Sequence, residues 1–92
     1  MTEVYRYKFD KSVPIQEAIE SLYLAIFASE GIHGRAQVLL AAGYAFDRRK
    51  RTLVVAAGSA VGRTICRIFT ALLARQFGET GFKVEHVEGE PA

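Results

Sequence analysis

The chain has 92 residues, of which 50% are apolar and 24% are charged, and its formal net charge at pH 7 is +2. This length allows one hydrophobic core, and the composition is that of a folded domain, so we expect a single domain over residues 1–92. No apolar run approaches the roughly 20 residues that a membrane-spanning helix needs, so no membrane contact is expected. The single cysteine excludes an internal disulfide. The single cysteine, together with the lack of a signal-peptide pattern in the first residues, favours a cytoplasmic protein.

The first strand is predicted over residues 4–10, because aromatic side chains at alternating positions give this segment one apolar face. A helix follows, and Ser12 is its expected N-cap. The apolar residues of this helix recur at helical spacing, and Gly31 is its expected C-terminal cap. Leu24 and Phe27 lie off the apolar stripe, which indicates that something covers the helix on a second side.

Residues 35–46 are predicted to form the second strand, with Val38 and Leu40 on the same face, although the first half of this segment could instead continue as helix. Residues 47–51 are charged and have the length of a hairpin turn. The third strand is then predicted over residues 52–57.

The second helix is predicted to begin near Ser59 as N-cap and to stop before Gly78. Its apolar residues form one continuous side. The last strand is expected over residues 82–87, and residues 88–92 are expected to be a frayed tail.

The order of elements is therefore βαββαβ, which predicts an α+β fold of the ferredoxin-like plait type. Its sheet is antiparallel, with four strands in the spatial order 4-1-3-2 and two helices on one face. In this topology the 47–51 turn lies at one end of the domain and the start of the second helix lies at the other. The basic residues therefore form two separate groups.

The first candidate site is the turn between the third strand and the second helix, where backbone N–H groups can bind phosphate. Ala57 stands where a P-loop has its first glycine, and Arg63 replaces the lysine. Helix capping by Ser59 explains the same residues. A weaker anion site remains as an alternative, formed by Gly58, Ser59, Arg63, Arg35 and His33.

The second candidate is the hairpin turn, which carries four consecutive cations: Arg48, Arg49, Lys50 and Arg51. Such a cluster can neutralise phosphates and give salt-sensitive binding to nucleic acid. A solvated, charged turn that keeps a hairpin soluble is the simpler explanation of the same residues. The aromatic platform that RNA-binding plaits use for base stacking is missing, because the aromatics of the first strand are expected to face the helices.

The preferred hypothesis is a non-enzymatic interaction module that self-associates as a homodimer or higher homo-oligomer. It rests on an apolar patch expected on the open sheet face, beside the edge formed by the second strand. The patch residues are Leu39, Ala41, Ala45, Val54 and Ala56. Catalytic candidates are few: Cys66 is expected to be a core thiol, and neither histidine has a second ligand at metal-binding spacing, so no metal or cofactor is predicted.

Overall fold

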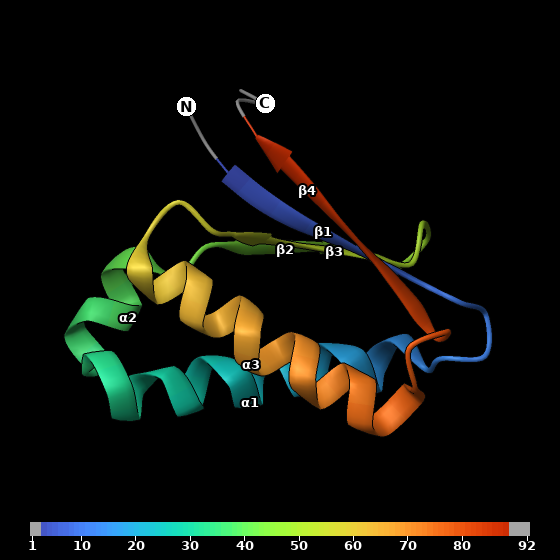
Figure 1. The fold of residues 1–92 in the computed structure, drawn as a ribbon, viewed down its shortest axis with the longest axis horizontal. Coiled ribbons are helices and arrows are strands. Elements are labelled where there is room, and N and C mark those ends of the chain that lie inside the picture. Colours follow the sequence, from blue (N-terminus) through green and yellow to red (C-terminus); the bar gives the residue numbers. More distant parts are fainter. Residues whose placement is uncertain (1–2, 89–92) are drawn as a thin grey trace.

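Four antiparallel strands form one open sheet, and the helices lie on one side of it (Figure 1). The computed structural model describes residues 3–88, so most of the tail predicted to fray lies outside the described residues. Within that range, no helix is long and apolar enough to cross a membrane. In chain order the elements are β1 (Glu3–Phe9), α1 (Ile15–His33), α2 (Arg35–Ala41), β2 (Tyr44–Asp47), β3 (Thr52–Ala56), α3 (Ala60–Phe77) and β4 (Phe82–Glu88).

The strands are ordered β2-β3-β1-β4, which is the predicted order 4-1-3-2 read from the opposite edge. β1 pairs with both β3 and β4, and β2 pairs with β3, in each case antiparallel. β1 and β2 therefore run in one direction, β3 and β4 run in the other, and β2 and β4 are the two edges. The α+β class and the four-stranded antiparallel sheet are confirmed.

The prediction of one strand over residues 35–46 was wrong. The segment forms the short helix α2 and then turns into β2 at Tyr44. Arginine, alanine, glutamine and leucine dominate α2, and all four are strong helix formers. Burial shows the helical period, because Val38 is 1% exposed and Leu40, two residues on, is 83% exposed. A strand would have placed these two side chains on the same face.

The ends of α1 also differ from the prediction. Ser12 does not cap the helix: its hydroxyl donates to Asp10 Oδ2 at 2.7 Å, and Pro14 occupies the N-cap position. The hydrogen bonds from Ser12 lower the pKa of the Asp10 carboxyl. The helix continues past Gly31 and ends at Gly34, whose φ of 87° is a conformation that glycine adopts without strain.

The start of α3 is as predicted. Ser59 is its N-cap, and its hydroxyl oxygen accepts a hydrogen bond of 3.0 Å from the backbone N–H of Gly62. This bond satisfies one of the backbone donors that a helix leaves unpaired at its first turn.

We expect Ser59→Ala to lower the free energy of unfolding by about 1 kcal/mol, because the Gly62 N–H loses its acceptor. Thermal unfolding should show this as a fall in Tm of about 4–8 °C. Ser12→Ala is the matched control, since Ser12 is exposed and caps no helix. Its Tm should change by less than half as much, and equal losses for the two variants would contradict the assignment of Ser59 as the cap.

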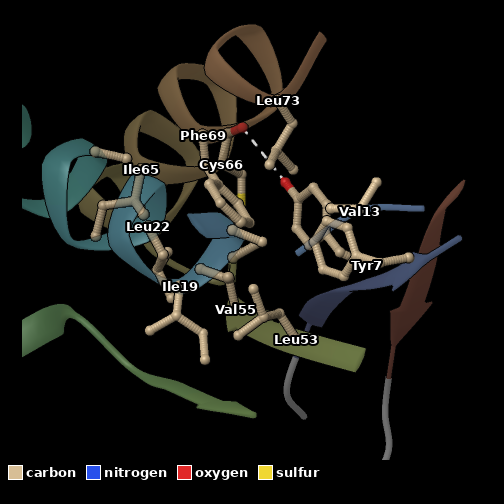
Figure 2. Close-up of a cluster of buried hydrophobic side chains, with 14 of the residues drawn as sticks. Tyr7, Val13, Ile19, Leu22, Leu53, Val55, Ile65, Cys66, Phe69 and Leu73 are labelled. Carbon is tan, nitrogen blue, oxygen red and sulfur yellow. Dashed lines mark hydrogen bonds between the residues drawn. The ribbon is translucent and has the colours of Figure 1, made fainter. Parts of the chain in front are cut away.

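The core lies between the sheet and helices α1 and α3 (Figure 2). Tyr7 points from β1 toward α3, where its hydroxyl lies 2.8 Å from Thr70 Oγ1 and 3.4 Å from the carbonyl oxygen of Cys66. Burial raises the pKa of the Tyr7 hydroxyl and of the Cys66 thiol. The predictions that the β1 aromatics face the helices and that Cys66 is a core thiol are confirmed. The largest fully buried side chains include Tyr7, Ile19, Leu22, Leu53, Ile65, Phe69 and Leu73.

Candidate functional site

The five residues of the predicted interface patch do not lie on one surface. Ala45 pairs with Val54 across β2 and β3, so these two side chains point to the same face of the sheet. Ala56 is two residues from Val54 and shares that face, which is the open one because Leu53 and Val55 are buried against the helices. The remaining two residues, Leu39 and Ala41, lie on α2 and are not part of the sheet.

Exposed apolar side chains concentrate elsewhere, on α1, α2 and β2. In residues 3–88, eight of the nine exposed large apolar side chains belong to these three elements. Phe27 on α1 is 71% exposed and Leu39 on α2 is 68% exposed. The eight residues are Tyr23, Leu24, Phe27, Ile32, Leu39, Leu40, Tyr44 and Phe46.

Some of these apolar side chains line a shallow groove of about 350 Å³ where α1, α2 and β2 meet. We call this feature the apolar groove. Its exposed apolar lining residues are Tyr23, Phe27, Leu39 and Tyr44. The rings of Tyr23 and Tyr44 are in edge-to-face contact, with centroids 6.1 Å apart. Partial burial is the main cause that raises the pKa of the Tyr44 hydroxyl, and the neighbouring Tyr23 raises this pKa further. The groove lies on the helix side of the sheet, because Tyr44 pairs with the buried Val55.

The sequence held one signal for this groove. Phe27 lies off the apolar stripe of its helix and outside its buried face, which also includes the serines Ser21 and Ser29. The expected cover on a second side is partly supplied by α2, which packs against α1. Phe27 nevertheless stays exposed, so its position remains the strongest sequence indication of a binding surface.

The edge strand β2 begins at this groove with Tyr44, and all four of its residues are exposed. The backbone N–H of Ala56 donates to the carbonyl oxygen of Gly43, which fixes the alternation of hydrogen bonds between β2 and β3. In an antiparallel pair, every second residue then turns its N–H and C=O outward. Those residues here are Tyr44 and Phe46. The outer edge of β2 therefore offers backbone donors and acceptors beside exposed aromatic side chains.

The structure gives the four cations of the hairpin turn different positions. Arg48 lies over the ring of Phe46, with its guanidinium carbon 5.5 Å from the ring centroid. Arg51 has a φ of 56°, and its guanidinium donates to the carbonyl oxygens of Asp10, at 2.9 Å, and Val13. It therefore ties the hairpin to the loop between β1 and α1. Arg49 is exposed, and Lys50 lines a concavity on the open face of the sheet.

The predicted anion site at the start of α3 is assembled only in part. His33 Nε2 lies 2.8 Å from the hydroxyl of Thr64, which is itself hydrogen-bonded to the carbonyl oxygen of Ala60. The end of α1 is therefore next to the first turn of α3. The hydroxyl of Ser59 already accepts a hydrogen bond from the backbone N–H of Gly62, and Gly58, Arg35 and Arg63 are exposed. No group of three or more potential metal ligands occurs within residues 3–88.

A second concavity, of about 880 Å³, lies on the open face of the sheet. Charged residues from β1, β4 and the β2–β3 hairpin line it, and cations outnumber carboxylates among them. It faces away from the helices and is therefore separate from the apolar groove.

Comparison of the chain with protein-family models, curated proteins and solved structures gives no match. The function therefore has to be inferred from the surfaces of this chain.

Proposed function

We propose that the chain is an interaction module that self-associates through the outer edge of β2 and the adjoining apolar groove. The observation that carries the proposal is the concentration of exposed large apolar side chains on α1, α2 and β2. Monomeric proteins rarely expose contiguous apolar patches of large size, and they usually protect a sheet edge. In this chain, an exposed edge and an apolar surface lie side by side.

A second copy of the chain fits both features. Two identical β2 edges can pair antiparallel about a two-fold axis perpendicular to the sheet, so that each offers the same groups to the other. This pairing keeps the helices of both copies on one side of the joined sheet. The apolar groove is on that side and beside that edge, so the two grooves face each other across the axis. The exposed backbone groups of Tyr44 and Phe46 find partners, and Phe27 and Leu39 become covered.

Binding is a better description of this surface than catalysis. The groove is lined by apolar and aromatic side chains with Glu30 as its single carboxylate, and it contains neither histidine nor cysteine. We therefore propose a non-enzymatic role, as a structural or regulatory subunit. The free thiol of Cys66 is buried and suits a reducing compartment, and on that basis we propose a cytoplasmic location.

We also propose that the fold is a ferredoxin-like plait with one additional helix. If α2 is set aside, the chain order is βαββαβ and the strand order is that of the plait. α2 occupies the connection between α1 and β2 and contributes Leu39 to the apolar groove. Because this fold hosts many unrelated activities, the proposed function rests on the surface and not on the fold.

The test is the oligomeric state of three proteins, measured by size-exclusion chromatography with light scattering. The unaltered chain should elute with twice the mass of one chain, at both low and moderate salt. The double variant Phe27→Glu, Leu39→Glu should be monomeric, because it places two charges in an apolar contact. Val54→Glu is the control, since it adds a charge to the open sheet face and should leave the dimer intact.

Two results would overturn the proposal. A monomeric unaltered chain would remove the self-association itself. A dimer that persists in Phe27→Glu, Leu39→Glu but dissociates in Val54→Glu would move the interface to the open face of the sheet. Absorbance at 260 nm should be recorded as well, because bound nucleic acid released by salt would instead favour the basic hairpin of Arg48, Arg49 and Lys50.

A further inference from the structure

The open face of the sheet carries a basic concavity that self-association through β2 does not use. Its floor is formed by β1, β3 and β4, and the β2–β3 turn bends away from the helices beside it (Figure 1). Six charged residues line the concavity: Arg6, Lys8, Asp47, Lys50, Lys83 and Glu85. Its volume of about 880 Å³ is within the range of small-molecule binding sites.

Hydrogen bonds within the chain already engage both carboxylates of the concavity. Glu85 forms an ion pair of 2.9 Å with Arg6. Asp47 Oδ1 accepts a hydrogen bond of 3.1 Å from the backbone N–H of Lys50, at the start of the turn. Within residues 3–88, the ammonium groups of Lys8, Lys50 and Lys83 form no ion pair. The concavity therefore has an excess of positive charge that the described part of the chain does not neutralise.

Two of these lysines are directly opposed in the sheet. Lys8 of β1 is the register partner of Lys83 of β4, so both side chains leave the sheet on the same face. Their Cβ atoms are then about 5 Å apart, and like charges in this position are destabilising. The neighbouring pair, Arg6 with Glu85, shows the favourable arrangement one step along the same face. An anion between Lys8 and Lys83 would turn a repulsive pair into two attractive contacts.

We propose that this concavity binds a small anion that carries phosphate groups. Lysine ammonium groups bind phosphate as point charges, and Lys8, Lys50 and Lys83 all belong to this one lining. On β1 and β3 this face carries no aromatic side chain that could stack on a base. Its residues there are Val4, Arg6, Lys8, Thr52, Val54 and Ala56. An extended nucleic-acid strand crossing the face would also have to pass the carboxylates of Asp47 and Glu85. A compact oligophosphate group needs no aromatic side chain for stacking and does not have to cross the two carboxylates.

The experiment is a calorimetric titration with inorganic tripolyphosphate at low ionic strength, where screening is weak. We expect binding to the unaltered chain, and at least a tenfold weaker affinity for the double variant Lys8→Gln, Lys83→Gln, because charged hydrogen bonds are lost. Arg67→Gln is the control for a loss of positive charge outside the concavity, since Arg67 is exposed on α3, on the other side of the sheet. Its affinity should stay within about twofold of that of the unaltered chain.

The same double variant gives a second readout without any anion. Removing the opposed charges should leave its Tm equal to that of the unaltered chain or higher by about 1–4 °C. A lower Tm would show that the opposed lysines do not repel each other, and the argument for an anion between them would fail. The proposal is also overturned if tripolyphosphate does not bind, or if Arg67→Gln weakens binding as much as the double variant. Lysine-dependent binding of an oligonucleotide with no response to tripolyphosphate would identify a nucleic-acid surface instead.

Discussion

Gly62→Ala is expected to lower the free energy of unfolding by about 3 kcal/mol or more. Gly62 lies in the first turn of α3, where the helix crosses close to the end of β3. A Cβ atom on Gly62 would overlap the carbonyl oxygen of Ala56 and lie 3.1 Å from the Cα of Ala57. Both neighbours are backbone atoms, so they cannot give way as a flexible side chain would. The helix would have to move away from the sheet.

The sign of this effect is not obvious from the sequence, because alanine is the better helix former by about 1 kcal/mol. The steric cost is larger than this gain, so we expect a net loss. Urea denaturation would measure it, and Tm should fall by at least about 12 °C. An unchanged midpoint would show that α3 does not approach β3 as closely as the structure indicates.

Gly31→Ala is the matched control for this substitution. Gly31 also lies within a helix, but a Cβ atom there would meet nothing within 4 Å. Only the gain in helix propensity remains, so the variant should be more stable than the unaltered chain by about 0.5–1 kcal/mol. The same substitution in two helices should therefore change stability in opposite directions, and the difference isolates the contact between Gly62 and β3.

Elements with several agreeing local signals were predicted correctly. In α3 the cap Ser59, the continuous apolar side and the stop at Gly78 all indicate the same helix, and the structure contains it. The alternating aromatics of β1 likewise predicted both the strand and its buried face. Each of these signals depends on residues close in sequence, so several of them can agree without any knowledge of distant contacts.

Residues 35–46 lacked such agreement. The segment is largely apolar. Because α2 and β2 are both short, neither a helical nor a strand pattern of apolar residues repeats often enough to be recognised. Gly34 did not indicate a second helix, because glycine ends a helix whether another helix or a strand follows. This error also misplaced Leu39. It was correctly singled out as an exposed apolar residue, but it belongs to the apolar groove and not to the sheet.

The candidate sites depend on register, which the sequence does not contain. Arg6, Lys8, Lys83 and Glu85 line the concavity on the open face. That Lys8 opposes Lys83 follows only from the pairing of β1 with β4, two strands more than 70 residues apart. A shift of one residue would have exchanged the faces of the whole strand. Long-range pairing, rather than composition, therefore creates the charge pattern.

Phe69→Ala should be the most destabilising truncation in the core, with a loss of about 3–5 kcal/mol. Phe69 is fully buried on α3, and its ring is in edge-to-face contact with Tyr7 at a centroid distance of 4.7 Å. Removing the ring leaves a cavity between α3 and the sheet and removes the aromatic contact with Tyr7. For a chain of this length the total stability is roughly 5–14 kcal/mol, so the loss is a large part of it.

Phe69→Leu keeps this prediction measurable if Phe69→Ala does not fold. Leucine fills most of the volume, so we expect a smaller loss of about 1–2 kcal/mol, read from denaturant unfolding monitored by circular dichroism. Losses below about 0.5 kcal/mol for both variants would contradict the central position of Phe69 in the core.

Phe27→Ala is the control that connects the core to the proposed function. Phe27 has the same side chain but is 71% exposed, so its truncation should change the stability of a single chain by less than about 0.5 kcal/mol. In a dimer formed through the apolar groove, Phe27 is covered, and its loss should lower Tm more as the protein concentration rises. Melting curves at concentrations about a hundredfold apart distinguish the two cases. A cost for Phe27→Ala that is independent of concentration would place that side chain in the fold of the single chain, and the groove would lose its most exposed contact.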